Sequence, residues 1–146
     1  MTIPIRVAYV DVLVLRGEGG ALQVLCLRRS AAGRSPGSWE GVHGHIDDGE
    51  TPVATALREV SEEAGLTPIR FYNLSRMESF YRHATNEVVL IPVFVAVVEP
   101  GALVRLSGEH DAFSWLAPEE AKVRMSWPRV RREIEDAVAL FGEGGA

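Results

Sequence analysis

Apolar positions recur along the chain in short runs, and their pattern predicts several strands. Residues 5–15 are almost continuously apolar and β-branched, which indicates a strand covered on both faces. A glycine-rich turn at residues 17–20 separates this run from a second strand at residues 21–29, so the two predict a hairpin. Further strands are predicted over residues 69–81, 87–98 and 113–116.

A helix is predicted over residues 52–64. Thr51 suits its N-cap, Pro52 its first position, and Gly65 the position just past its end. At about 100° per residue, one set of apolar side chains falls on a single stripe, which we expect to dock on the core. This stripe consists of Val53, Leu57, Val60 and Ala64.

A second long helix is predicted to open at Ser126-Trp127-Pro128, with Ser126 as its N-cap and Pro128 in its first turn. A short helix starts near residues 117–120, whereas residues 30–41 form a predicted loop and residues 142–146 a disordered tail. The side chains of the long helix that we expect to face the core are Val130, Ile134, Ala137 and Phe141.

The order of elements predicts one domain over residues 1–146, because no repeat, low-complexity block or linker interrupts it. Strands and helices are mixed along the chain, so the expected class is α/β or α+β with a mixed, partly antiparallel sheet.

The composition is that of an ordinary globular protein. A chain of 146 residues is long enough to bury a core without disulfides, and the only cysteine, Cys26, is predicted to be a buried, unreactive thiol. The net charge of −5 argues against general nucleic-acid binding. The longest apolar run, residues 88–98, is too short for a membrane-spanning helix, and the N-terminus lacks the features of a signal peptide. We therefore expect a cytoplasmic protein with a small-molecule partner.

Three glutamates late in the first helix, Glu59, Glu62 and Glu63, are the leading candidates for chemistry. The C-terminal end of a helix carries partial negative charge, so carboxylates are disfavoured there. Glu59 and Glu63 also repel each other at i,i+4 spacing. A divalent metal ion would compensate this charge, and oxygen ligands suit Mg²⁺, with Mn²⁺ as a substitute. The alternative is a solvated acidic helix surface.

Two further features adjoin the three glutamates. Gly44 and Gly49 bracket a short acidic loop, whose backbone is able to approach a metal or a phosphate closely. Glu50, at the junction of loop and helix, either orients the loop or reaches the metal. Arg58 pairs with Glu62 at i,i+4 spacing or with Glu50 across the turn, and it is either a simple surface ion pair or a direct substrate contact.

The segment from Gly44 to Leu66 resembles the Nudix box, the signature of the Nudix hydrolase family. That pattern is Gly, five residues, Glu, seven residues, Arg-Glu, an aliphatic residue, any residue, Glu-Glu, any residue, Gly and an aliphatic residue. Nine specified positions over 23 residues match it, namely Gly44, Glu50, Arg58, Glu59, Val60, Glu62, Glu63, Gly65 and Leu66.

The resemblance implies an α/β/α sandwich around a mixed sheet. It also implies magnesium-dependent hydrolysis of a nucleoside diphosphate linked to another group, in a protein that is often a homodimer. The implied metal site contains Glu59, Glu62 and Glu63 together with Gly44 and Glu50. The implied role of Arg58 is to support these residues during catalysis.

Glu109 lies in a loop before the predicted strand at residues 113–116. In several members of the family an acidic residue from such a loop completes the metal site or serves as the general base, and an ordinary loop glutamate is the alternative. Carboxylates around a metal titrate as a coupled set, so the base stays open among Glu62, Glu63 and Glu109.

The candidates for substrate binding come from three places. Arg28 and Arg29 end the second predicted strand, where they are able to face phosphates. His43 lies where many family members have Pro-Gly-Gly; it donates to a phosphate or, as we favour for both His43 and His45, is an exposed loop histidine. Tyr81 stacks on a base or packs at a rim. The same alternatives apply to Phe80 and Trp39, and further cationic candidates are Arg34, Arg82 and His83.

We expect a magnesium-dependent pyrophosphohydrolase that converts a nucleoside or pterin triphosphate to the monophosphate and pyrophosphate. The chain shows weaker similarity to the deoxy-ATP and dihydroneopterin triphosphate pyrophosphatase branch, carried by the entry to the box at Val42, by Glu109-His110 and by Ser126-Trp127. The alternatives are hydrolysis of dinucleoside polyphosphates, ADP-ribose or nucleotide sugars, and a catalytically inactive nucleotide-binding regulator.

Overall fold

The long apolar run near the N-terminus becomes the centre of a mixed sheet. In the computed structural model, which describes residues 2–142, strand β2 (Tyr9–Arg16) is buried along most of its length. It pairs in parallel with β7 (Glu87–Val97) and antiparallel with β5 (Val42–His45) and β3 (Gln23–Arg29). The remaining strands are β1 (Ile5–Val7), β4 (Trp39–Glu40), β6 (Arg70–Arg82) and β8 (His110–Leu116).

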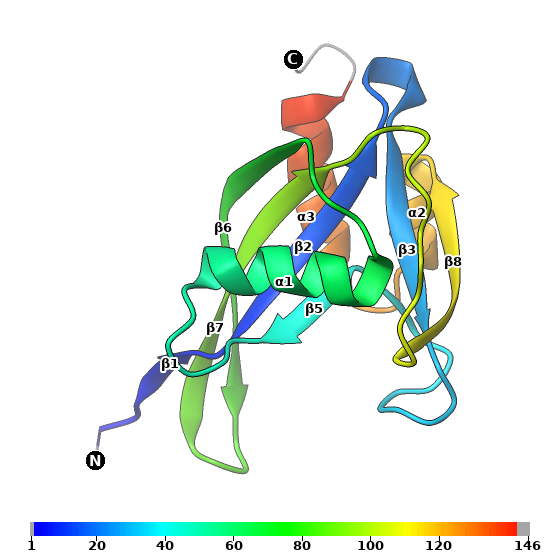
Figure 1. Ribbon diagram of the computed structural model, residues 1–146. Coiled ribbons are helices and arrows are strands. Elements are labelled where there is room, and N and C mark those ends of the chain that lie inside the picture. Colours follow the sequence, from blue (N-terminus) through cyan, green and yellow to red (C-terminus); the bar gives the residue numbers. More distant parts are fainter. Residues whose placement is uncertain (1, 143–146) are drawn as a thin grey trace.

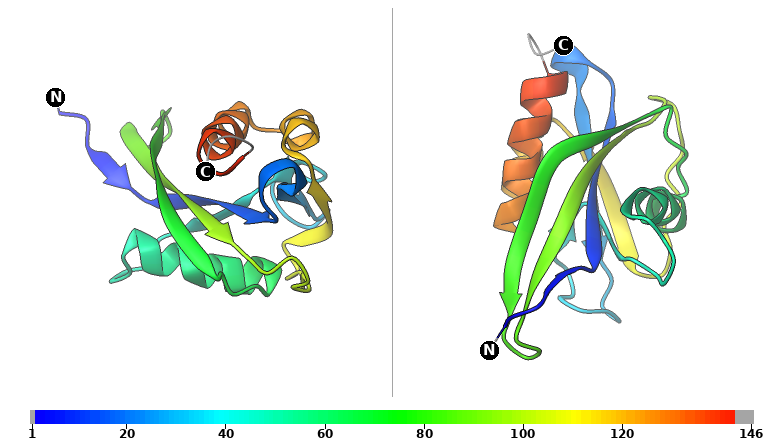
Figure 2. Two further views of the ribbon diagram at one scale, coloured as in Figure 1. Left: turned by 90° about the horizontal axis from the view of Figure 1, so that it is seen from above. Right: turned by 90° about the vertical axis from the view of Figure 1, so that its left-hand side faces the viewer.

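Helices cover both faces of this sheet (Figures 1 and 2). Helix α1 (Pro52–Ala64) lies across one face, and α2 (Pro118–Arg124) and α3 (Pro128–Phe141) lie together on the other. A single turn of 3₁₀ helix, Gly19–Ala21, connects β2 to β3. The arrangement confirms the expected α/β/α sandwich around a mixed sheet.

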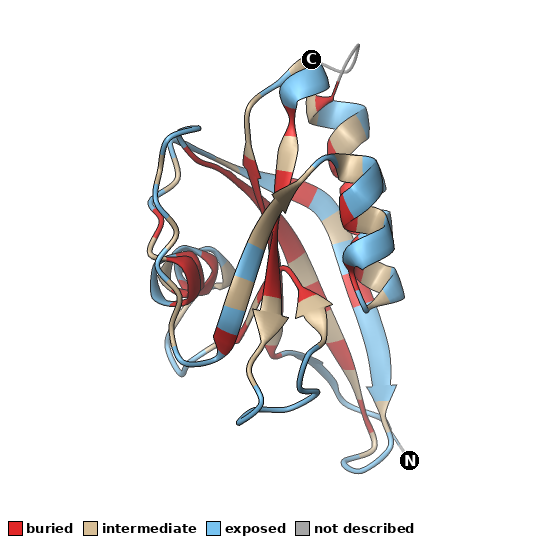
Figure 3. Ribbon diagram, turned by 90° about the vertical axis from the view of Figure 1, so that its right-hand side faces the viewer, coloured by how far each residue is buried: buried red, intermediate tan, exposed pale blue. Residues whose placement is uncertain are grey.

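The two-residue period of a strand divides β2 between two core layers. Val10, Val12 and Val14 pack with the layer under α1, whereas Leu13 and Leu15 pack with the layer under α3. Figure 3 shows the buried sides of the helices turned toward the sheet. Asp11 shares the α3 side with Leu13, so this alternation alone carries a buried carboxyl group to that layer.

Several boundaries differ from the sequence-based expectations. The predicted strand over residues 5–15 breaks at Ala8, and β1 lies at an edge where Ile5 is 66% exposed, so it is not covered on both faces. The predicted loop over residues 30–41 contains the short strand β4, which pairs with β3. The predicted hairpin is confirmed only near its turn, because β3 leaves β2 after two paired positions to pair with β4 and β8.

The C-terminal helix α3 begins at Pro128, one residue later than a cap at Ser126 implies. Ser126 is not its N-cap, because its Oγ accepts a hydrogen bond from the backbone N–H of Trp39 at 2.9 Å and Trp127 takes the cap position. The expected core positions Val130, Ile134 and Ala137 are buried. Of the predicted tail, the Gly142 N–H bonds to the Val138 carbonyl at 2.8 Å, and residues 143–146 lie outside the described residues.

Two expectations from composition are also met by the fold. Cys26 is fully buried, and burial raises the pKa of its thiol to about 12, so it is unreactive. None of the helices within residues 2–142 has the length and apolar character needed to cross a bilayer.

Candidate active site

Helix α1 holds an acidic edge against the sheet. Its ends are those that the sequence predicts: Thr51 Oγ1 accepts from the Ala54 N–H at 3.2 Å, and Gly65 has a left-handed backbone with φ of 66°. The predicted docking stripe is wrong in part, because Val53 and Leu57 are 45% and 40% exposed.

The side chains of α1 that face the sheet are Ala56, Val60, Ala64, Glu59 and Glu63. The apolar residues of this face are small, so the helix lies close to the strands. In this orientation the acidic edge also faces inward. Glu59 and Glu63 are therefore buried, whereas Glu62 has 58% of its side chain exposed.

Arg58 is the positive centre of the acidic edge. Its guanidinium donates to both carboxylate oxygens of Glu50, at 2.7 and 2.8 Å, and to Glu59 at 2.8 Å and Glu62 at 3.1 Å. It also donates to the His45 carbonyl at 3.1 Å. The two pairings that the sequence offered as alternatives, with Glu62 and with Glu50, are therefore both present. The hydrogen bond from Arg58, followed by those from the Asp47 N–H and the Thr55 hydroxyl, lowers the pKa of Glu50 to about 2.

Glu63 is the one glutamate of the three that Arg58 does not contact in the structure. Its side chain is 2% exposed, and neither carboxylate oxygen has a conventional hydrogen-bond donor among the described residues. Burial, followed by the neighbouring carboxylates of Glu59, Glu109 and Glu40, raises the pKa of Glu63 well above its ordinary range. Burial and these neighbouring charges therefore disfavour the ionised form of this carboxyl group. A buried carboxylate without a partner is costly, and a hard cation that binds oxygen ligands would compensate its charge.

His110 joins Glu63 to the opposite side of the site. Its Nε2 lies 2.8 Å from Oε2 of Glu40, and its Nδ1 lies 3.8 Å from Oε1 of Glu63, too far for a direct hydrogen bond. All three side chains are buried, and their ligand atoms lie within 4.8 Å of one another, an arrangement that is able to hold a metal ion. Side chains from β4, α1 and β8 thus bring potential metal-ligand atoms together at one place in the fold.

Gly44 allows β5 to pass directly under the acidic edge. A Cβ atom at this position would lie 2.3 Å from Cγ and Cδ of Glu59, so any side chain there would displace the carboxyl group. Gly44 belongs to β5 and not to a loop, and it pairs with Val10 of β2. The glycine of the box is therefore required by close contact with Glu59.

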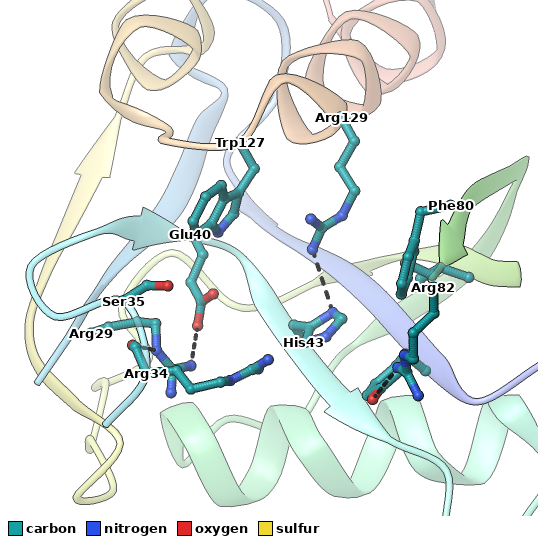
Figure 4. A pocket seen from close by; sticks show the side chains of 11 residues that line it. Arg29, Arg34, Ser35, Glu40, His43, Phe80, Arg82, Trp127 and Arg129 are labelled. Carbon is teal, nitrogen blue, oxygen red and sulfur yellow. Dashed lines mark hydrogen bonds and ion pairs between the residues drawn. The ribbon is translucent and has the colours of Figure 1, made fainter. Parts of the chain in front are cut away.

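A pocket of about 340 Å³ lies beside this acidic edge (Figure 4). It is formed by residues of β2, β4, β5, β6 and β7, by the end of β3 and the loop after it, and by the start of α3. Glu40 lines it and also contacts His110, so the pocket and the acidic edge share a wall. The full lining is Tyr9, Arg29, Arg34, Ser35, Glu40, His43, Phe80, Arg82, Ile91, Trp127 and Arg129.

Two of the four predicted substrate-binding residues line this pocket. Arg29 lies there with its Nη1 3.0 Å from Glu40, and His43 lies there with its Nδ1 2.7 Å from Asp11. The preference for an exposed loop histidine at position 43 is wrong, because His43 is on β5 with 17% of its side chain exposed.

The other two candidates lie elsewhere. Arg28 is paired with Asp111 at 2.7 Å, and Tyr81 is 53% exposed with its hydroxyl donating to Asn86. Strand alternation explains Tyr81, because its neighbours Phe80 and Arg82 are the residues of β6 that line the pocket. Glu109 is exposed next to His110, close enough for its charge to act on Glu63.

Sequence reasoning missed Glu40, His110 and Arg129. Glu40 and His110 meet through pairing of β4 and β8 on either side of β3, which no local pattern reveals. Arg129 carried one available signal: Asp11 interrupts an apolar strand, and a buried aspartate needs a positive partner. That partner is Arg129, whose Nε lies 2.8 Å from Oδ2 of Asp11.

Comparison with known proteins agrees with this geometry. An octanoyltransferase from Myxococcus xanthus is 32% identical over 89% of this chain, and the chain spans 36% of that protein. A dihydroneopterin triphosphate diphosphatase from Escherichia coli is 30% identical over 88% of this chain and 91% of its own length. The crystal structure of a C. elegans Ap4A hydrolase binary complex matches with a TM-score of 0.74 at 23% identity, covering 90% of this chain and 95% of that one.

The family model of the NUDIX domain matches residues 5–137 and so spans the acidic helix, the pocket and most of α3. It therefore includes the complete Gly44 to Leu66 motif and the strands that bury its glutamates. On this match, the chain belongs to the Nudix hydrolase family.

Proposed function

We propose that this protein is a magnesium-dependent Nudix pyrophosphohydrolase that cleaves a nucleoside or pterin triphosphate to the monophosphate and pyrophosphate. The observation that carries the proposal is Glu63, a buried carboxyl group without a conventional donor. It lies 3.8 Å from His110, which contacts Glu40 in the pocket wall. Buried acids without a compensating partner are costly, and a divalent cation supplies that compensation.

The proposed metal-holding residues are Glu59, Glu62 and Glu63. Mg²⁺ bound there would neutralise phosphate charge and activate water for attack on phosphorus. Glu62 faces solvent, which leaves it accessible to a ligand that also contacts substrate oxygens. The ligand atoms of Glu40, His110 and Glu63 lie within 4.8 Å of one another. Because Glu40 also lines the pocket, this cluster joins the metal-holding glutamates to the pocket wall.

Other residues of the box position these carboxylates. Both oxygens of Glu50 accept bonds from Arg58, and one also accepts from Thr55 and the Asp47 N–H, so we assign Glu50 a positioning role. Arg58 then holds Glu59 and Glu62 from the same guanidinium. The close approach at Gly44 keeps Glu59 against β5.

The pocket supports a substrate that has both an anionic and a ring-bearing part. Arg34 lines its mouth without a carboxylate partner among residues 2–142, so it is available to a phosphate. Phe80 and Trp127 line it with aromatic surface that suits a heterocycle. The similarity to the dihydroneopterin triphosphate diphosphatase supports the same class of substrate.

A second candidate is hydrolysis of a dinucleoside polyphosphate by the same residues. Similarity to a bis(5'-nucleosyl)-tetraphosphatase from Sus scrofa, 32% identical over 75% of this chain and 74% of that protein, favours it. The products distinguish the two, because a nucleoside triphosphate yields pyrophosphate, whereas a dinucleoside polyphosphate yields two nucleotides.

The test is a panel of nucleoside triphosphates, a pterin triphosphate and dinucleoside polyphosphates, incubated with Mg²⁺ and resolved by chromatography. We expect metal-dependent release of pyrophosphate from at least one triphosphate. Glu63→Gln is the matched control, since it preserves the shape of the side chain and removes its charge. Absence of Mg²⁺-dependent turnover of every compound would reject the proposed hydrolase, and turnover of the dinucleoside compounds alone would select the second candidate.

A further inference from the structure

The four arginines that line the pocket differ in whether a carboxylate is paired with them. Arg29 is paired with Glu40 at 3.0 Å, Arg82 with Glu87 at 3.2 Å and Arg129 with Asp11 at 2.8 Å. Among residues 2–142, Arg34 is the only arginine of the four without a carboxylate partner. The pocket is therefore close to neutral, which suits a heterocycle better than a polyphosphate chain.

Arg129 presents a fixed donor to this neutral pocket. Its Nε and Nη2 bond to the two oxygens of Asp11, at 2.8 and 3.2 Å, in the two-point geometry that a guanidinium and a carboxylate favour. Its third nitrogen, Nη1, has no hydrogen-bond partner among the described residues. Figure 4 shows the side chain reaching from the start of α3 toward His43. Arg129 thus has one free donor arm and little freedom to move it.

Asp11 is built to hold this guanidinium. Burial alone would raise the pKa of Asp11, but hydrogen bonds from His43, Glu133 and Arg129 outweigh it and keep its pKa below the usual range. Glu133 lies one turn after Arg129 on α3 and is 1% exposed. Burial and the charge of Asp11 raise the pKa of Glu133 well above its ordinary range, which disfavours a second negative charge beside Asp11.

The neighbouring wall is aromatic. The ring of His43 stacks on Tyr9 with centroids 5.2 Å apart and an interplanar angle of 16°. The Tyr9 hydroxyl accepts from Arg82 at 2.7 Å, and the guanidinium of Arg82 also lies over the ring of Phe80. Arg129, His43, Tyr9 and Arg82 therefore form a continuous, cross-linked wall with a donor at the Arg129 end.

We propose that Arg129 is a specificity-determining residue whose free Nη1 donates to a ring carbonyl oxygen of the substrate, so that the pocket selects oxo-substituted heterocycles over amino-substituted ones. A guanidinium matches the carbonyl oxygen of an oxopurine or a pterin, whereas the amino group of adenine offers a second donor at the equivalent position. The inference rests on the proposed function, because it takes the ring-bearing part of such a triphosphate as the occupant.

A binding experiment with two monophosphates tests this inference without turnover. IMP and AMP have the same ribose and phosphate. They differ at C6, which is oxo in IMP and amino in AMP, and at the adjacent N1, which carries a proton only in IMP. Isothermal titration of the wild-type protein is expected to show IMP binding at least about tenfold tighter than AMP, the effect of one well-placed hydrogen bond against one unmatched donor.

Arg129→Lys keeps a cation beside Asp11, so folding is preserved, but it lacks the second arm of the fork. This variant is expected to bring the IMP to AMP affinity ratio within about twofold of unity. Arg132→Lys is the matched control on the same helix, where Arg132 contacts Glu78 and does not line the pocket. It is expected to retain the wild-type ratio.

Three results would overturn the inference: no wild-type preference for IMP, an unchanged preference in Arg129→Lys, or an equal loss of affinity for IMP and AMP in that variant. The last result would show that Arg129 contacts the shared ribose phosphate. Failure of the proposed function is a separate observation, since it is the absence of triphosphate turnover and does not depend on this ratio.

Discussion

Nδ1 of His110 lies 3.8 Å from Oε1 of Glu63, with both side chains buried. The two residues are far apart in sequence and come from β8 and α1. Their proximity places the acidic helix edge and the pocket on either side of one small cluster, because His110 also contacts Glu40 in the pocket wall. The proposed metal-holding edge and the proposed substrate pocket thus share a boundary.

Glu63→Gln is expected to lower turnover by about two orders of magnitude or more, because it removes a carboxylate that would hold the metal. The fold should persist, since the buried side chain keeps its shape and burial raises the pKa of Glu63, so its charge is not needed for folding. Steady-state kinetics and thermal unfolding measure the two effects. Mg²⁺ should raise the Tm of the wild-type protein and raise that of the variant less. Near-normal turnover would remove Glu63 from the site.

Arg58 separates the effect of charge from that of geometry. Arg58→Lys keeps the charge but is unable to bond to Glu50, Glu59 and Glu62 at once, because lysine has a single nitrogen. We expect a loss of activity of about 10- to 100-fold and a lower Tm, with a larger loss of both in Arg58→Ala. Kinetics at saturating Mg²⁺ provide the measurement. Equal behaviour of the lysine variant and the wild-type protein would show that charge alone matters.

Gly44→Ala is expected to displace Glu59, because the new Cβ would lie 2.3 Å from its Cγ and Cδ. A shift of about 1 Å in a catalytic group is enough to lower activity by about 100-fold. The control is Gly20→Ala, where an added Cβ meets no atom within 4 Å. Only the Gly44 variant should require more Mg²⁺ for half-maximal activity. A similar Mg²⁺ requirement in both variants would contradict the close-contact argument.

Glu133 gives the stability of the protein a predictable dependence on pH. The pKa of Glu133 is raised in the folded state by burial, by Asp11 and by Glu78, with Arg129 opposing, whereas an unfolded glutamate titrates near about 4.3. Above that value the folded state binds a proton that the unfolded state has lost, so the free energy of unfolding falls as pH rises toward the folded pKa.

Urea unfolding at a series of values between about pH 5 and about pH 8 measures how the free energy of unfolding changes with pH. The free energy of unfolding of the Glu133→Gln variant should fall less steeply with pH than that of the wild-type protein. Glutamine is neutral in both the folded and the unfolded state. Some slope should remain, since the pKa of Glu63 is raised in the same direction. Superimposable slopes would show that Glu133 is ionised in the folded protein.

The local elements of the site followed from the sequence. Helix α1 has the predicted ends, because Thr51, Pro52 and Gly65 act through bonds and backbone preferences within one turn. The spacing of the box also predicted a cluster of carboxylates on one edge. The sequence did not predict which face of α1 meets the sheet. The periodicity of Val53 and Leu57 does not reveal that small residues must face a nearby strand.

The order and spacing of residues along the chain therefore determined the acidic helix, its arginine and the class of chemistry they support. The tertiary structure alone decided which carboxyl group lacks a partner, which arginines are paired with a carboxylate and which aromatic rings face the pocket. The physical reason is that burial and pairing depend on strands brought together from distant parts of the chain. Asp11 meets Arg129, and Glu40 meets His110, only after the sheet has formed and α3 has packed on it.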